Sequence, residues 1–183
     1  LGIAFEREQV LELAGDGMVC AETIAQSALQ MPENRTHPLV RPLLPGGALA
    51  DRPLVNFYWS VCAPGKPAYV PVDFMTAGQA VDLIHEASGV AILAHPGVSI
   101  AQESVLDNVL QLPLDGVEAF SSYHTMQQAC SYVQKAKASG LLLSGGSDFH
   151  GRIKPDIRIG AVDWQGCESE AIAALLDAIK NTR

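Results

Sequence analysis

Three short runs of apolar residues, separated by stretches with helical periodicity, constrain the fold of this chain more than any other feature. They span residues 90–94, 114–120 and 141–143. Strands that are apolar throughout are typically buried on both faces, as in a parallel sheet covered by helices. We therefore expect residues 73–183 to form an α/β piece, with a further strand at 157–162 and a final helix at 168–180.

Two capping-box sequences mark where helices begin in this region. Thr76 is followed three residues later by Gln79, and Thr125 by Gln128. In each pair the threonine hydroxyl and the glutamine amide can satisfy the free backbone groups of a first helical turn. Glycines at 89 and 140 are the natural stops, because glycine readily adopts the left-handed conformation that ends many helices.

Residues 1–72 differ from the rest of the chain in proline content and in the spacing of apolar residues, and they predict a small helical piece. Residues 32–53 hold five of the eleven prolines, which favours loops and short turns there. Leu54, Phe57, Tyr58 and Val61 then follow the i, i+3, i+4, i+7 spacing of an amphipathic helix. The expected organisation is thus a helical piece over 1–72 and an α/β piece over 73–183.

Composition excludes several classes of protein. With 183 residues, 48% of them hydrophobic, the chain can bury a core and is not disordered as a whole. A net charge of −8 argues against a protein that coats nucleic acid through positive charge alone. No apolar run approaches the roughly 20 residues of a membrane span, so we expect no membrane association.

The cysteines and the first residue give two further expectations. The four cysteines are widely spaced and form no Cys-x-x-Cys pair, which indicates reduced, mostly buried thiols in a cytoplasmic protein. The chain begins with Leu1 rather than Met, so we expect it to be a processed or trimmed piece of a longer protein.

Residues able to carry chemistry follow each of the three apolar runs. His95 comes directly after the first run, His124 after the second, and Asp148 and His150 after the third. In parallel α/β folds, ligands bind at the carboxyl ends of the strands. These four side chains are therefore the candidate site.

Metal binding is the chemistry that these residue types favour. On an extended segment Asp148 and His150 would point to the same side, and with His95 they offer ligands that suit Zn, Mn or Fe. The alternative for Asp148 and His150 is a helix cap and a surface turn. For His95 it is a half-buried histidine that is merely hydrogen-bonded.

Three other residues, together with His124, are candidates for substrate binding and catalysis. His124 precedes a helix start, where it can ligate a metal or hold a phosphate oxygen, or simply flank the cap. Glu118 lies among apolar strand residues, so it is expected to support the site or to form an internal salt bridge. Arg152 and Lys154 are candidates to contact substrate phosphates, with a solvated basic loop as the alternative.

These motifs together resemble the PHP (polymerase and histidinol phosphatase) superfamily, in particular its tryptophan-operon-associated phosphoesterase branch. The matching segments are Gly65-Lys66-Pro67-Ala68-Tyr69-Val70-Pro71, Ala94-His95-Pro96-Gly97, Gly116-Val117-Glu118 with Ser122-Tyr123-His124, and Gly145-Gly146-Ser147-Asp148-Phe149-His150-Gly151. The good match covers about residues 66–160, and the helical start resembles an inserted subdomain of that branch more loosely.

The resemblance implies a distorted (βα)7 barrel, of which this chain would be the carboxy-terminal part, with a cluster of two or three divalent metals such as Mn, Zn or Fe. It implies hydrolysis of phosphate esters of nucleotides or short oligonucleotides, as by a 5′-nucleotidase or a 5′–3′ exonuclease. His95, Asp148 and His150 match metal ligands. Glu118 and His124 match positions near the metal shell and the substrate.

The chain departs from the family pattern at its amino end. Its five histidines, at 37, 85, 95, 124 and 150, form no His-x-His motif, so the opening ligands of the family are missing. Three readings follow: an incomplete portion of a phosphoesterase, a non-catalytic remnant that binds a nucleotide, metal or partner, and, more weakly, an amidohydrolase. Exposed barrel edges would favour association with another chain.

Overall fold

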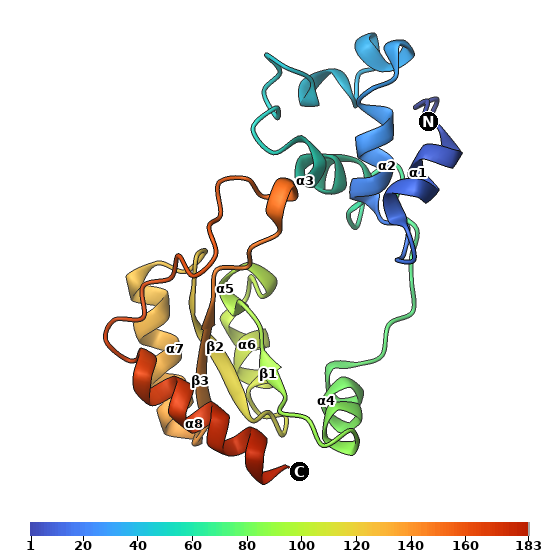
Figure 1. The fold of residues 1–183 in the computed structure, drawn as a ribbon. Coiled ribbons are helices and arrows are strands. Elements are labelled where there is room, and N and C mark those ends of the chain that lie inside the picture. Colours follow the sequence, from blue (N-terminus) through green and yellow to red (C-terminus); the bar gives the residue numbers. More distant parts are fainter. Residues whose placement is uncertain (183) are drawn as a thin grey trace. The chain divides into compact units, whose positions relative to one another are not determined.

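A computed structural model describes residues 1–182 and divides the chain into two compact units (Figure 1). The helical unit comprises Leu1–Asp73 together with His150–Asp156. The sheet unit comprises Phe74–Phe149 and the residues from Ile157 onward. The segment that begins at His150 therefore belongs to the helical unit, although its neighbours along the chain on both sides belong to the sheet unit.

The sheet unit is built on three parallel strands in the order β1-β2-β3. The strands are β1 (Ile92–Leu93), β2 (Gly116–Ser121) and β3 (Leu142–Gly146). The helices are α4 (Ala77–Glu86), α5 (Pro96–Ser99), α6 (Glu103–Val109), α7 (Met126–Ser139) and α8 (Glu168–Asn181). The expected α/β class with a parallel sheet is confirmed.

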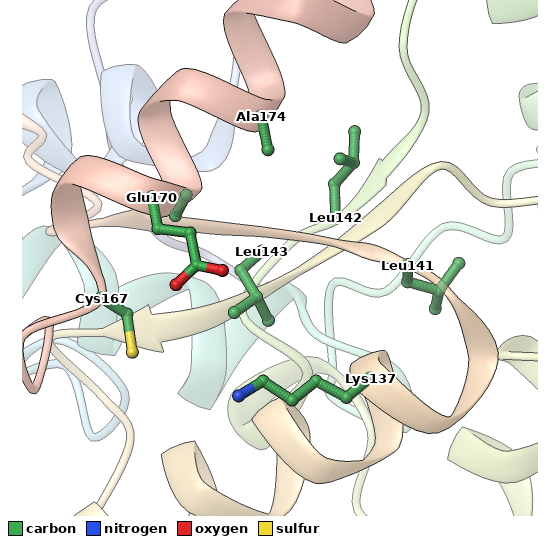
Figure 2. Close-up of a pocket in the computed structure, with 8 residues that line it drawn as sticks. Lys137, Leu141, Leu142, Leu143, Cys167, Glu170 and Ala174 are labelled. Carbon is green, nitrogen blue, oxygen red and sulfur yellow. The ribbon is translucent and has the colours of Figure 1, made fainter.

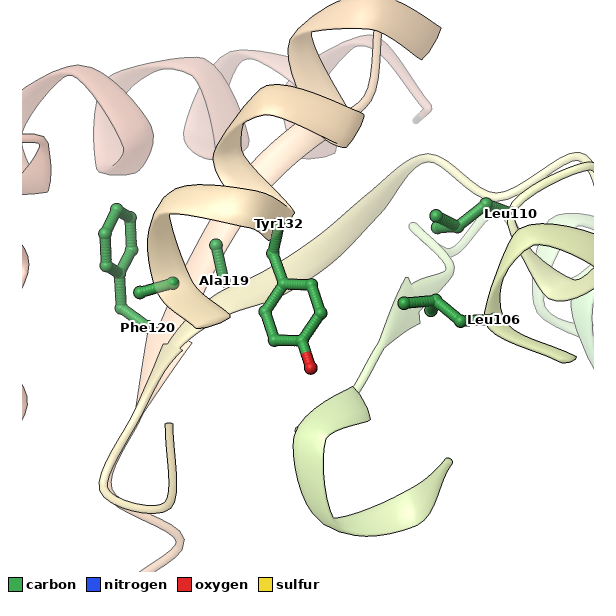
Figure 3. Packing of buried hydrophobic residues seen from close by; sticks show 6 residues of the cluster. Leu106, Leu110, Ala119, Phe120 and Tyr132 are labelled. Atoms are coloured by element: carbon green, nitrogen blue, oxygen red, sulfur yellow. The ribbon is translucent and has the colours of Figure 1, made fainter. Parts of the chain in front are cut away.

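Burial differs among the strands because two of them lie at sheet edges. All six residues of the central strand β2 are buried, whereas β1 and β3 are half-buried. Leu106 and Leu110 pack with Ala119 and Phe120 of β2 and with Tyr132 of α7 (Figure 3). This core holds β2, which carries the candidate residue Glu118, against its neighbouring helices.

Both predicted capping boxes are confirmed. The Thr76 and Thr125 hydroxyls accept from the backbone N–H groups of Gln79 and Gln128, each over 3.2 Å. Gly140 ends α7 in the left-handed conformation, as expected. Helix α4 instead ends at Glu86, three residues before the predicted stop at Gly89.

The strand expected at 157–162 is wrong. This segment forms turns and irregular backbone, and Gly160 takes a φ of +70°. Ile157 is buried, but residues 158–161 are exposed, so the apolar side chains there do not cover a sheet face. The run fails as a strand because it pairs with no other strand among the described residues.

The helical unit contains short helices with their own core. They are α1 (Arg7–Ala14), α2 (Ala21–Ala28), η1 (Pro32–Thr36), η2 (Arg41–Leu43), α3 (Pro53–Phe57), the π-helical turn η3 (Tyr58–Cys62) and η4 (Gly151–Ile153). Ala25, Leu43, Phe57 and Val61 form the buried cluster. The helix expected from the spacing at Leu54 is present and continues into η3.

Asn34 is a fully buried polar residue that the sequence did not single out. Its Oδ1 accepts from the backbone N–H of Ala4, and its Nδ2 donates to the carbonyls of Ala4 and Ala28 at 2.7 and 2.8 Å. These three bonds tie the chain start to the end of α2 and give both the amide oxygen and the amide nitrogen of the side chain hydrogen-bond partners.

None of the helices within residues 1–182 has the length and apolar character needed to cross a membrane.

All four cysteines are free thiols, as expected, but Cys20 and Cys130 are exposed rather than buried. The prediction of mostly buried thiols is wrong, because Cys62 and Cys167 are only half-buried and the other two face solvent from a helix or its cap.

Candidate active site

Glu118 joins the ends of the first two strands of the sheet. Its side chain lies within β2, only 8% exposed, and its Oε2 accepts a 2.6 Å hydrogen bond from the backbone N–H of His95. Glu118 makes no ion pair among the described residues, so the internal salt bridge that was the alternative is not formed there. A buried carboxylate thus holds the backbone from which His95 projects.

His95 is held in an uncommon backbone conformation. Its φ of +28° lies in the region that non-glycine residues rarely occupy, and such strain recurs at functional sites. Its Nδ1 contacts the Ser99 hydroxyl at 2.8 Å, one helical turn later. The ring is thereby oriented through Nδ1, which leaves Nε2 as the nitrogen that can face a ligand.

Asp148 follows β3 and is braced by the turn after β2. The Tyr123 hydroxyl donates a 2.6 Å hydrogen bond to its Oδ2, and the Ser122 hydroxyl donates to the Ser147 carbonyl. The Tyr123 ring also meets the His95 ring edge to face, with centroids 6.2 Å apart. Glu118, His95, Tyr123 and Asp148 therefore form one connected set at the carboxyl ends of three parallel strands.

The segment from Asp148 to His150 is not the extended strand that we expected. Asp148 has a φ of +53°, so the simple alternation that would place both side chains on one side does not apply. His150 caps η4 and belongs to the helical unit, as do Arg152 and Lys154. The structure thus places His95, Glu118 and Asp148 in the sheet unit, together with His124. His150, Arg152 and Lys154 lie in the helical unit.

His124 has a supporting position in this arrangement. Its Nδ1 contacts the Ala119 carbonyl at 2.9 Å and its Nε2 accepts from the Gly97 N–H at 3.1 Å. Both ring nitrogens are therefore engaged within the protein. His124 thereby ties the turn after β1 to β2, and its catalytic role stays a prediction.

The surroundings of His124 keep it in place. Its ring packs edge to face on Tyr132, with centroids 4.9 Å apart. Burial, together with the nearby Glu103 carboxylate, raises the pKa of the Tyr132 hydroxyl above its ordinary value. Gly97 leaves room for the imidazole, because a Cβ there would lie 2.7 Å from its Cδ2.

The sequence did not predict two contacts in this site, His95 with Ser99 and Tyr123 with Asp148. Ser99 lies four residues after His95, a spacing that places both side chains on one face of a helical turn and could have revealed it. Tyr123 lies within the Ser122-Tyr123-His124 motif, but no neighbouring residue indicates that its hydroxyl contacts Asp148. Ser121, at the end of β2, has a buried hydroxyl with no hydrogen-bond partner in the described part of the chain.

The donor atoms agree in kind with a divalent metal, but they do not make a complete set. Imidazole nitrogen and carboxylate oxygen are common ligands of Zn, Mn and Fe. Within residues 1–182 no three His, Cys, Asp or Glu side chains are grouped to hold an ion. His95 and Asp148 therefore fit a metal as part of a ligand set that needs further donors.

A separate pocket in the sheet unit is not part of this site. It measures about 150 Å³ and lies between β3, the last turn of α7 and the start of α8 (Figure 2). Its lining is Lys137, Leu141, Leu142, Leu143, Cys167, Glu170, Ala171 and Ala174. None of the candidate site residues lines it.

Several known proteins are similar to this chain. No protein-family model matches the chain. It is 32% identical over 124 residues to a 3′,5′-nucleoside bisphosphate phosphatase of Chromobacterium violaceum, covering 64% of this chain and 41% of that protein. It is 31% identical over 133 residues to the 5′-3′ exoribonuclease Rnm of Escherichia coli, covering 70% of this chain and 45% of that enzyme. This chain is a homologue of PHP-type phosphoesterases.

The chain spans less than half the length of each of these two relatives. Solved structures agree on the fold. A protein of Bifidobacterium adolescentis, provisionally classed as a metal-dependent phosphoesterase, matches 97% of this chain and 57% of its own with a TM-score of 0.66 at 19% identity. An amidohydrolase of Chromobacterium violaceum matches 89% of this chain and 61% of its own with a TM-score of 0.56 at 26% identity.

Proposed function

We propose that this chain supplies one part of the catalytic site of a metal-dependent phosphoesterase that hydrolyses phosphate esters of nucleotides or short oligonucleotides. The observation that carries the proposal is the connected set of Glu118, His95, Tyr123 and Asp148 at the carboxyl ends of three parallel strands. The two curated relatives act, by their names, on a nucleoside bisphosphate and on RNA.

Each residue of the set has a distinct task in this proposal. His95 and Asp148 would hold the metal, the former through Nε2, because Nδ1 is engaged with Ser99. Glu118 fixes the backbone of His95, and Tyr123 fixes the carboxylate of Asp148. A bound divalent metal supplies an acidified water and neutralises charge on the phosphoryl oxygens.

The remaining candidates extend the same proposal. His150 would be a further ligand, and Arg152 and Lys154 would contact substrate phosphates as cations. His124 would act near the substrate only if the bond from Gly97 opened. Mn, Zn and Fe all suit this mixture of imidazole and carboxylate donors.

The proposal extends to architecture and location. The sheet unit would be the carboxy-terminal part of a distorted barrel, and the helical unit an inserted subdomain. Among the described residues β1 and β3 each pair only with β2, which leaves one edge of each for association. Four free thiols are in keeping with the reducing cytoplasm.

A second candidate function is a non-catalytic protein that binds a nucleotide, a metal or a partner. The absence of a three-residue metal group within residues 1–182 favours it. The two candidates differ in one measurable property, which is turnover of a phosphate ester with added metal.

The test is titration with Mn²⁺ and Zn²⁺ together with hydrolysis assays on a nucleoside 3′,5′-bisphosphate and a 5′-phosphorylated oligonucleotide. We expect His95→Ala and Asp148→Asn to weaken metal binding at least about 10- to 100-fold. Asp82→Asn, on the exposed side of α4, is the matched control and is expected to behave as the unmodified chain. No metal binding and no turnover would sink the enzyme proposal, and unchanged turnover in Asp148→Asn would sink the site assignment.

A further inference from the structure

An exposed tryptophan stands out in the helical unit. Trp59 is 55% exposed, although tryptophan is mostly buried in folded proteins. It lies in η3, a π-helical turn, and such turns recur at functional sites. The Tyr58 ring meets it edge to face, with centroids 5.0 Å apart, which restricts the orientation of the indole.

Trp59 forms one wall of a pocket of about 470 Å³. Arg52 and Asn56 of the same helical stretch line it, as do Asp51, Pro155 and Asp156. The Arg52 guanidinium pairs with the Asp156 carboxylate, and the Asn56 amide donates to the Leu49 carbonyl at 3.0 Å and to Asp51 at 2.9 Å. The polar side chains of the pocket therefore hold one another in place.

The charge of the lining selects among ligands. Arg52 is neutralised by Asp156, and Asp51 adds a negative charge, so the pocket has no surplus positive charge to hold a phosphate. It offers instead a flat aromatic surface with carboxylate and amide oxygens at its rim. Such a surface suits an uncharged planar group that carries amino donors.

The pocket also shares a chain segment with a candidate site residue. Pro155 and Asp156 close the segment that His150 opens, and all of these residues belong to the helical unit. His150, which is proposed to bind near the substrate phosphate, is thus only six residues before Asp156 in the wall of the pocket.

We infer that this pocket binds a nucleobase of the substrate by stacking on Trp59, with Asp51 and Asn56 accepting hydrogen bonds from an exocyclic amino group. The inference rests on the proposed function, since it names the part of a nucleotide substrate that this pocket recognises. Stacking of bases on aromatic side chains is tolerant of sequence, so the preference is for bases that carry an amino group rather than for one base.

The experiment compares two probes on the unmodified chain and its variants. The probes are a short single-stranded oligoadenylate and an abasic sugar–phosphate oligomer of the same length, with dissociation constants from calorimetry. We expect the oligoadenylate to bind more tightly than the abasic oligomer. Trp59→Ala should weaken oligoadenylate binding about 5- to 100-fold, and weaken abasic binding far less.

Two control variants keep the test specific, with circular dichroism to verify folding. Trp59→Phe keeps an aromatic face and should retain most of the oligoadenylate affinity. Tyr69→Ala removes an aromatic ring that is also exposed in the helical unit but does not line the pocket, and should bind as the unmodified chain does.

Several outcomes would overturn the inference. These are no measurable oligoadenylate binding, equal affinity for the two probes, or equal losses in Trp59→Ala for both. Tighter binding of spermidine than of oligoadenylate at Trp59 would assign the acidic pocket to cations instead. Trp59-dependent base binding without any phosphate-ester hydrolysis would overturn the proposed function and leave the base pocket supported.

Discussion

The hydroxyl of Tyr123 donates a 2.6 Å hydrogen bond to the carboxylate of Asp148, across two strand ends that are 25 residues apart in the chain. The bond fixes one carboxylate oxygen of a residue whose own backbone is strained, with a φ of +53°. A residue in that region persists only when its surroundings hold it there. Tyr123 is therefore a positioning residue for the proposed site.

Replacing Tyr123 by Phe removes this bond and keeps the ring. We expect a loss of about 1–2 kcal/mol in unfolding free energy, because the Asp148 carboxylate loses one hydrogen-bond donor. We also expect weaker Mn²⁺ binding, since the Tyr123 hydroxyl no longer orients that carboxylate. Urea unfolding and metal titration measure the two effects. Tyr132→Phe, in the core of the same unit, is the control, and equal metal affinity in both variants would contradict the positioning role.

Gly97→Ala tests the packing that holds His124. The added Cβ would lie 2.7 Å from the imidazole Cδ2 and 3.1 Å from the Gln128 amide nitrogen, so the ring must move. We expect a loss of about 1–3 kcal/mol, typical of overpacking, and a changed His124 resonance in NMR spectra.

Gly78→Ala is the matched change for that experiment. A Cβ at Gly78, in α4, meets only the Leu112 side chain at 3.8 Å, which is an ordinary contact. Alanine is also the better helix former, so this variant should be neutral or more stable. If the two alanine variants unfolded alike, close packing at Gly97 would be refuted.

Asn34→Ala tests the polar centre of the helical unit. The substitution leaves the Ala4 N–H and two carbonyls without their buried partner. We expect a loss of about 3 kcal/mol and faster hydrogen exchange at Ala4. Asn181→Ala, at the exposed end of α8, should change stability by less than about 0.5 kcal/mol. A mild effect at Asn34 would show that water replaces the amide.

The pH dependence of stability can be predicted for Lys135. Hydrogen bonds to Asp107 and then to Glu103 raise the pKa of its ammonium, linking α7 to α6. The folded state therefore holds this proton more tightly than the unfolded state does. The contribution is fully present below the usual lysine pKa of about 10.4 and is lost as pH rises through the higher folded value.

The size of this effect is small because both acidic partners are largely exposed. We expect Lys135→Met to lose less than about 1 kcal/mol at pH 8 and to approach the stability of the unmodified chain as the pH rises through the folded pKa of Lys135. Denaturant melts at several pH values, with and without 1 M NaCl, measure the difference. If the difference in unfolding free energy between the two proteins increased with pH, the raised pKa of Lys135 in the folded state would be contradicted.

What could be read from the sequence is local. The capping boxes at Thr76 and Thr125 and the glycine stop at Gly140 depend on a few neighbouring residues, and each is found where expected. The strand ends that carry His95 and Asp148 follow from the apolar runs before them. These features need no knowledge of distant contacts.

What could not be read depends on partners far along the chain. The positive φ angles of His95 and Asp148 coincide with hydrogen bonds between these residues and partners more than 20 residues away: the His95 N–H donates to Glu118, and Asp148 accepts from Tyr123. The predicted strand at 157–162 failed because a β-rich run forms a strand only where another strand is free to pair with it.

The ion pair between Arg52 and Asp156 spans 104 residues and closes the helical unit with a segment made late in synthesis. On the ribosome, the helices within residues 1–73 emerge before this segment and lack one wall until residue 156 has been translated. Domains generally fold as units during translation, so completion of this one is delayed by the whole span of the strands. A truncated gene that ended at residue 73 would therefore encode the helices without the wall of the pocket beside Trp59.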